Sequence, residues 1–123
     1  MYYYPKTYFY ILGRTVMNSV LCGCSAYNEK YYLDPKYEGL PSQIRDELKI
    51  MCVSYTADVG GILTLEFEED GTLVFRTECD EGDLLYDEIG SVLKVKQMSI
   101  EKRELLESLE LYYKVKNGLA KVE

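Results

Sequence analysis

The densest group of side chains that could do chemistry is a run of carboxylates between residues 78 and 88. It contains Glu78, Asp80, Glu81, Asp83, Asp87 and Glu88. Clustered carboxylates can hold Ca²⁺ or Mg²⁺, but an EF-hand loop needs acids at alternate positions, then a glycine and a distal glutamate, and this run lacks that spacing. A solvated turn followed by acids at a helix N-terminus explains the run more simply, so we expect no metal site here.

The four cysteines are the second candidate for chemistry: Cys22, Cys24, Cys52 and Cys79. Two thiolates one residue apart, as in Cys22-Gly23-Cys24, can chelate a soft metal. On a strand these two side chains point the same way, however, while Cys52 lies on a helical stripe that predicts a core position. Free cysteine is among the most buried residue types. We therefore expect reduced, structural thiols and no cofactor.

Features typical of an enzyme are scarce. The chain has no histidine, which removes the commonest general base and the commonest metal ligand. Asp58 beside Gly60-Gly61 resembles a small-molecule site, but phosphate-binding glycines precede a helix, whereas these follow a predicted one. We interpret the glycine pair as a helix stop and lean against an enzyme.

Tyrosines supply the one pattern that favours a function. Tyr27, Tyr31, Tyr32 and Tyr37 lie within eleven residues. Tyrosine is enriched at protein interfaces because it is large, rigid and partly polar, although half-buried packing explains such a cluster equally well. We predict that these four tyrosines form a binding surface for a protein partner or a second copy of the chain.

The charge of the chain narrows the classes of partner. Fourteen basic and twenty-one acidic residues give a net charge of −7, which opposes binding to nucleic acid and to anionic membranes. The apolar run Tyr8–Leu12 is too short for a signal peptide or for a membrane span of about 20 residues. We expect a cytoplasmic protein with neither a nucleic-acid nor a membrane partner.

At 123 residues the chain has the length of one domain. Residues 1–16 differ from the rest, since they are rich in tyrosine and contain no acid. They are either an extra edge strand or an extension upstream of a start at Met17, and we favour the extension. The predicted division is therefore an extension at 1–16, a single domain at 17–116 and a tail at 117–123.

The best-marked element is a helix from Pro41 to Val59, with proline at its first position. Apolar residues recur at spacings of three and four along it, and Ile50, Val53 and Ala57 are expected to widen the buried stripe towards its end. The stripe consists of Ile44, Leu48, Met51, Cys52, Tyr55 and Val59.

A hairpin over residues 62–77 follows the helix. A three-residue loop, Glu69-Asp70-Gly71, pairs Phe67 with Leu73 and Leu65 with Phe75, which keeps one face apolar. The opposite face is then expected to be largely solvated. Its residues are Thr64, Glu66, Glu68, Thr72 and Arg76.

The remaining elements are weaker. We predict strands at 20–24 and 30–33, with a short helix through Tyr27, Tyr31 and Tyr32 as the alternative to the second. A helix at 84–95 is predicted to begin after an Asp83 cap, and Gly90 within it permits close packing against another backbone. A further helix at 100–116 ends at Asn117-Gly118, and Ser99 either caps it or lies within a continuous helix. The expected buried side chains are Leu85, Ile89 and Val92 or Leu93 in the first of these helices, and Leu105, Leu106, Leu109, Tyr112 and Tyr113 in the second.

Together these elements predict a single α+β domain, an antiparallel sheet of about four strands with two or three helices packed on one face. Three segments also resemble an uncharacterised family of small proteins from Gram-positive anaerobic bacteria, over about residues 19–114. The segments are LCGCSAYNEKYYLDPKYEGLP, RDELKIMCVSYTADVGGILTLEFEEDG and EGDLLYDEIG. The resemblance implies a bacterial cytosolic setting and carries over no catalytic or binding residue.

Two functions remain open from the sequence. The first is a non-enzymatic interaction or regulatory module that binds protein through its tyrosines. The second is a small-ligand-binding protein or enzyme with a carboxylate-lined pocket, which requires Asp58, Glu66 or Asp87 to converge. An acidic mimic of nucleic acid is a third possibility that rests on net charge alone.

Overall fold

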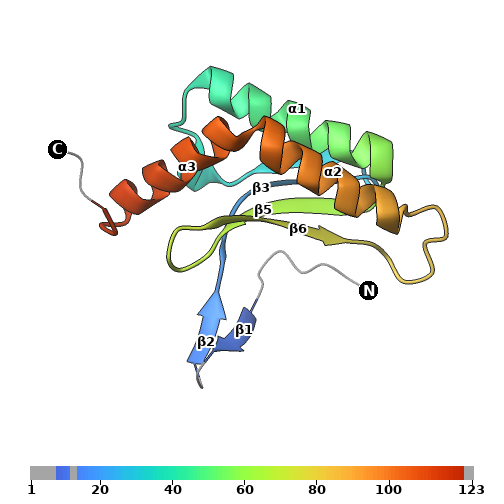
Figure 1. The fold of residues 1–123 in the computed structure, drawn as a ribbon, viewed down its shortest axis with the longest axis horizontal. Helices are drawn as coiled ribbons and strands as arrows, with labels where there is room; N and C mark the ends of the chain where they lie inside the picture. The colour runs from blue at the N-terminus through green and yellow to red at the C-terminus, as the bar shows by residue number, and fades with distance from the viewer. Residues whose placement is uncertain (1–7, 12–13, 121–123) are drawn as a thin grey trace.

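The computed structural model describes residues 8–11 and 14–120. Four strands form an antiparallel sheet in the order β4-β3-β5-β6, and three helices lie on one face of it (Figure 1). The elements are β3 (Ser19–Ser25), β4 (Lys30–Leu33), η1 (Pro35–Tyr37), α1 (Ser42–Val59), β5 (Ile62–Phe67), β6 (Leu73–Glu78), α2 (Glu88–Glu101) and α3 (Arg103–Lys116). The predicted α+β class and both early strands are confirmed, and the alternative short helix through Tyr27, Tyr31 and Tyr32 is wrong.

Two further strands, β1 (Tyr8–Ile11) and β2 (Arg14–Met17), pair with each other in a separate antiparallel sheet. The rest of the predicted extension, residues 1–7 and 12–13, lies outside the described residues, as do residues 121–123 of the tail. The division of the chain at residues 16 and 116 stays a prediction.

The β5–β6 hairpin has the predicted register. Phe67 pairs with Leu73 and Leu65 with Phe75, and the Glu68 N–H donates to the Thr72 carbonyl at 2.8 Å. Gly71, with φ of 91°, supplies the left-handed residue that closes the three-residue loop. The apolar side chains of β5 therefore share the face under the helices.

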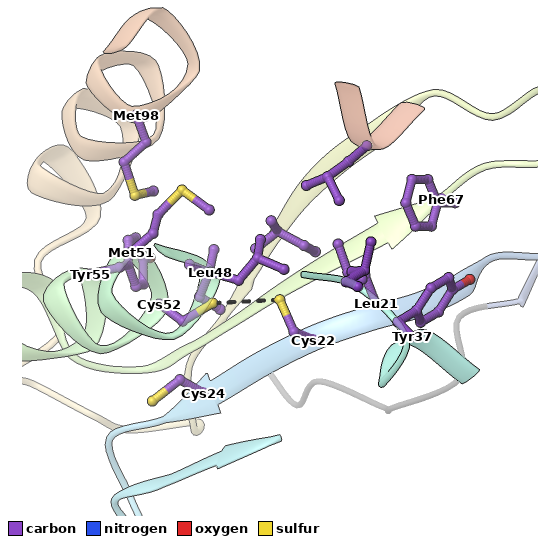
Figure 2. Packing of buried hydrophobic residues seen from close by; sticks show 14 of the residues in the cluster. Leu21, Cys22, Cys24, Tyr37, Leu48, Met51, Cys52, Tyr55, Phe67 and Met98 are labelled. Carbon is purple, nitrogen blue, oxygen red and sulfur yellow. Dashed lines mark hydrogen bonds between the residues drawn. The ribbon is translucent and has the colours of Figure 1, made fainter. Parts of the chain in front are cut away.

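The core lies between that face and the helices (Figure 2). Its centre joins β3 to α1, where the Cys22 and Cys52 sulfurs lie 3.8 Å apart and both side chains are buried. The hydrogen bond with Cys22 and burial raise the pKa of Cys52 well above its usual range. A thiol held protonated in this way is a poor nucleophile and a poor metal ligand, as expected of a structural cysteine.

The opposite face of β5 is less solvated than predicted. Thr64 and Glu66 are both buried, and the Glu66 carboxylate is paired with protein groups rather than with water. Its Oε1 accepts from Asn18 Nδ2 at 3.1 Å and from Arg76 Nε at 3.2 Å. Sequence alternation marks the two faces of a strand, but it does not show that a charged side chain on the second face is paired and covered.

Two details of α1 also differ from the prediction. The helix begins at Ser42, with Pro41 as its N-cap rather than its first helical residue, whereas its end at Val59, with Gly60 (φ of 88°) as the C-cap, is as predicted. Ile50, Val53 and Ala57 are exposed. The predicted widening of the buried stripe is wrong, because these three residues lie on the side of the helix away from the sheet.

The next helix begins four residues later than predicted. Asp87 caps α2, and its Oδ1 accepts from the Gly90 N–H at 2.8 Å. Asp83 instead accepts from the Leu85 N–H at 3.0 Å within a turn. The close neighbour of Gly90 is the Asp87 carboxylate, where an added Cβ would clash, and not a second backbone. Ser99 lies inside α2, and α3 follows directly with Leu109 buried.

Candidate functional site

The structure separates the four tyrosines of the predicted binding surface. Tyr27 and Tyr32 are exposed by 42% and 52%, whereas Tyr37 is buried against Phe67 with its hydroxyl 2.8 Å from Ser19 Oγ. Tyr31 is half-buried on the core side of β4. The four side chains therefore do not form one exposed surface.

Three of these tyrosines, Tyr31, Tyr32 and Tyr37, line one open groove of about 890 Å³. The groove runs along β3 and β4 to the end of α3, and it also contains Lys30 and Lys116. The Lys116 ammonium lies 4.9 Å from the centre of the Tyr37 ring, in cation–π geometry. This groove has the size and mixed lining of a small-molecule site.

The fourth tyrosine, Tyr27, has a separate structural role. Its hydroxyl donates to Asp83 Oδ2 at 2.6 Å and accepts from the Asp80 N–H at 2.8 Å. Local desolvation, followed by the bond to Asp83, raises the pKa of Tyr27 to about 12, and the same bond lowers the pKa of Asp83. Tyr27 thus fastens the loop before α2 to the β3–β4 turn.

The carboxylates required for an acidic pocket do not converge. Asp58 Oδ2 accepts from Lys94 Nζ at 2.7 Å on the helical layer. Glu66 lies on the opposite face of the sheet with Arg76, and Asp87 caps α2. Each carboxylate has its own partner in a different part of the fold, so these three residues form no shared acid–base site.

A feature that the sequence pattern missed is an exposed apolar surface at the start of α2. It consists of Leu84, Leu85, Ile89, Val92 and Leu93, which are 95%, 93%, 76%, 69% and 62% exposed. The prediction that Leu85, Ile89 and Val92 or Leu93 form the buried face of a helix is wrong. We call these five residues the apolar surface.

The apolar surface points outwards because polar groups fix the other side of α2. Tyr55 on α1 is buried, and its hydroxyl lies 2.8 Å from Ser91 Oγ and 3.0 Å from the Tyr86 hydroxyl. Tyr86 also donates to Ser91 at 3.0 Å. Together with buried Met98, this network turns the Ser91 side of the helix inwards. Ile89, Val92 and Leu93 are consequently left in solvent.

A hollow of about 490 Å³ lies beside the apolar surface. Leu84, Val92 and the Tyr86 ring contribute apolar atoms to it. Five carboxylates line the same hollow, and we call them the acidic rim: Glu78, Asp80, Glu81, Asp83 and Glu88. Apolar and acidic groups therefore share one surface.

Within residues 8–11 and 14–120, no three cysteine, aspartate or glutamate side chains are placed to hold a metal ion. In the same part of the chain, none of the helices has the length and apolar character needed to span a bilayer.

Comparison with known proteins identifies the family. The model of a family of unknown function, DUF6145, matches residues 18–120, and the chain belongs to that family. Neither the curated proteins nor the solved structures gave a match.

Proposed function

We propose that this member of the DUF6145 family is a non-enzymatic interaction module of the bacterial cytoplasm that docks a partner protein on its apolar surface. The observation that carries the proposal is the exposure of five large apolar side chains within ten residues. Exposed apolar groups are normally scattered singly over a protein surface, and a contiguous patch marks an interaction site.

The arrangement of groups supports the same function. The centre of a protein interface is apolar and poor in charge, and its rim is polar. Ile89, Val92 and Leu93 are neighbours on successive turns of α2, and the acidic rim lies next to them. If a partner fully buried one of these three apolar side chains, the burial would contribute about 1.5–3 kcal/mol to the free energy of binding.

Site-specific photo-crosslinking tests the proposal. A photoreactive residue replaces Leu85 in the full chain, which is then expressed in the cells that make the protein and irradiated. We expect a crosslinked product of defined mass. The same residue in place of Ile50 is the matched control, because Ile50 is also apolar and 68% exposed but lies on α1.

The proposal is wrong if the Leu85 position gives no crosslinked product. It is also wrong if the Ile50 position gives the same products, because contact would then not be confined to the apolar surface. Circular dichroism of both variants establishes that they fold like the parent protein.

The groove lined by Tyr31, Tyr32 and Tyr37 favours a second candidate function, the binding of a small anionic ligand. The groove of about 890 Å³ lies within the usual range for ligand sites. Its charged lining consists of Lys30, Lys36 and Lys116 and a single carboxylate, Asp34. The net charge of the groove is therefore positive, although that of the whole chain is negative.

Thermal melts with nucleoside phosphates and aromatic carboxylates test this second function. A ligand that raises the midpoint for the parent protein, but not for the Tyr32→Ala variant, supports the groove. Equal shifts in both proteins would rule the groove out.

A further inference from the structure

We propose that the segment docked on the apolar surface is a basic amphipathic helix of the partner protein. This inference rests on the proposed function and names the chemistry of the partner. It follows from the carboxylates around the apolar surface, from the hollow that they share with apolar side chains, and from the repulsion that they would exert on acidic partners.

The sequence around the apolar surface is strongly acidic. Residues 77–93 contain no lysine or arginine and six carboxylates, so this stretch has a charge of −6 in a chain whose net charge is −7. The apolar surface lies within the same stretch. A partner that covers it brings its own charges next to these carboxylates, and cations there are attracted.

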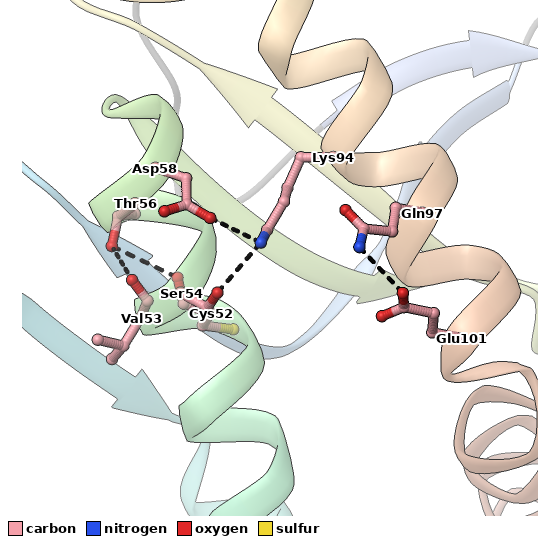
Figure 3. Close-up of polar contacts among 8 residues, drawn as sticks. All are labelled: Cys52, Val53, Ser54, Thr56, Asp58, Lys94, Gln97 and Glu101. Atoms are coloured by element: carbon pink, nitrogen blue, oxygen red, sulfur yellow. Dashed lines mark hydrogen bonds and ion pairs between the residues drawn. The ribbon is translucent and has the colours of Figure 1, made fainter.

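The basic residues that flank this stretch in the sequence, Arg76 and Lys94, are already engaged. Lys94 donates to Asp58 at 2.7 Å and to Ser54 at 3.2 Å, both on α1 (Figure 3). Its ammonium is held towards α1 and does not neutralise the acidic rim. Arg76, the last basic residue before the stretch, is paired with Glu66 on the outer face of the sheet.

The hollow beside the apolar surface places apolar side chains and carboxylates together. Leu84 and Val92 line it beside Asp80, Glu81 and Glu88. A lysine or arginine side chain has an apolar stem and a charged head, so it matches a hollow of this composition.

Glu78 also lines the hollow, and its Oε2 is buried with no hydrogen-bond donor among the described residues. A donor from the partner would offset the cost of that burial.

The shape of the apolar surface matches a helical partner segment. Ile89, Val92 and Leu93 form a ridge with spacings of three and four residues on a regular helix. Such a ridge packs into the groove between the side-chain rows of a second helix. A helix with leucine-type residues on one side and lysine or arginine beside them therefore matches both the ridge and the acidic rim.

Other occupants fit less well. A second copy docked through the same surface would place one acidic rim against another, because a two-fold interface pairs each patch with itself. Nucleic acid and anionic membranes would meet the same repulsion. A basic helix is the occupant that uses the apolar surface and the acidic rim together.

Binding of a designed peptide tests the inference on the full chain. The probe is a fluorescent amphipathic helix of about 18 residues built from leucine and lysine, and its matched control replaces every lysine with glutamate. We expect the lysine peptide to bind in about 0.15 M salt, and the glutamate peptide to bind at least about tenfold more weakly.

Two pairs of variants locate the binding. Leu85→Ser with Ile89→Ser should weaken it about tenfold, whereas Ile50→Ser with Val53→Ser, which are also exposed but lie on α1, should leave it unchanged. Asp80→Asn, Glu81→Gln and Glu88→Gln together should weaken it and flatten its salt dependence. The control with the same charge change is Asp46→Asn, Glu47→Gln and Glu107→Gln, which lie outside the acidic rim.

Several results would overturn the inference. Equal binding of the two peptides, or equal loss in the two apolar variants, would show that binding is not specific to this surface. A dimer in sedimentation that is lost on Leu85→Ser would assign the surface to a second copy. Crosslinking at Leu85 without binding of the lysine peptide would leave the interaction module standing and reject the basic helix alone.

Discussion

Tyr27 shows how one exposed side chain can organise a surface. Its hydroxyl joins the β3–β4 turn to Asp80 and Asp83, and these residues lie in the loop that carries Leu84 and Leu85. The sequence pattern singled out Tyr27 as a binding residue, a role that stays a prediction. The hydrogen bonds of Tyr27 indicate instead a tether that positions the loop of the apolar surface.

The first prediction concerns this tether. Tyr27→Phe removes the hydroxyl that donates to Asp83, so the pKa of Asp83 should rise towards its ordinary value. Carboxyl NMR titration measures the change. Tyr32→Phe is the control, because Tyr32 donates to Asp34 and not to Asp83. An unchanged Asp83 pKa in Tyr27→Phe would show that the hydrogen bond does not form in solution.

The tether also predicts a pH dependence. The pKa of Tyr27 is raised from 10.0 to about 12 in the folded state. Folding therefore favours the protonated phenol, and the stability that this contributes is full below pH 10 and lost as the pH rises to about 12. Urea unfolding in this range should show a smaller alkaline loss for Tyr27→Phe than for the parent.

At the scale of the element, the start of α2 is specified by one cap. Gly90 is the third residue of the helix, and its lack of a Cβ leaves room for the Asp87 carboxylate. An alanine at this position has the higher helix propensity but would displace the cap. The two effects oppose each other.

The second prediction separates these effects with a double-mutant cycle. Gly90→Ala alone should not stabilise the protein, because the new Cβ displaces the Asp87 carboxylate. In an Asp87→Ala background, the same change should stabilise it by up to about 1 kcal/mol. Urea unfolding measures both steps. Equal effects in the two backgrounds would show that Gly90 and the cap are independent.

The third prediction tests which side of each helix is buried. Leu48 on α1 is fully buried, so Leu48→Ala should lower the free energy of unfolding by about 2–5 kcal/mol. Leu93→Ala on α2 should change it by less than about 0.5 kcal/mol, because Leu93 is 62% exposed. A large loss from Leu93→Ala would mean that the side predicted from the sequence is the buried one.

The sequence predicted some elements well for physical reasons. The β5–β6 register follows from bulky residues at alternate positions, since only the three-residue loop places Leu65 opposite Phe75. The α1 stripe follows in the same way from Leu48, Cys52 and Tyr55. In β5 the alternate apolar residues are the ones that face the helices, and in α1 the residues spaced by three and four are the buried ones, although Ile50 and Val53 on the other side of α1 are also apolar and are exposed.

The start of α2 and the candidate site could not be predicted in this way. Asp83 and Asp87 are both suitable caps, and apolar residues follow each of them. Periodicity shows that Ile89 and Val92 share a face, but a core face and a docking face have the same pattern. The deciding contact joins Ser91 to Tyr55, a polar pair 36 residues apart that no local pattern reveals.

At the scale of the whole molecule, the four-stranded sheet and its helices share one hydrophobic core cluster. The family match begins at residue 18, close to the predicted boundary at residue 16.

The fourth prediction is that residues 17–123 fold without the extension. We expect a single cooperative thermal transition with a midpoint close to that of the full chain, because the core cluster is retained. Differential scanning calorimetry of the two chains measures it. An unfolded or strongly destabilised shorter chain would move the domain boundary towards residue 1.

The order of strands in the sheet also has a consequence for biosynthesis. β3 is a central strand whose second partner, β5, follows α1 in the chain, so β3 is made long before that neighbour exists. The 42 residues from Ala26 to Phe67 separate the end of β3 from the end of β5, which corresponds to about 2–8 seconds of translation. During that interval Cys22 and Cys24 lack the neighbours that bury them in the folded protein. Once α1 and β5 are in place, the finished protein encloses both thiols.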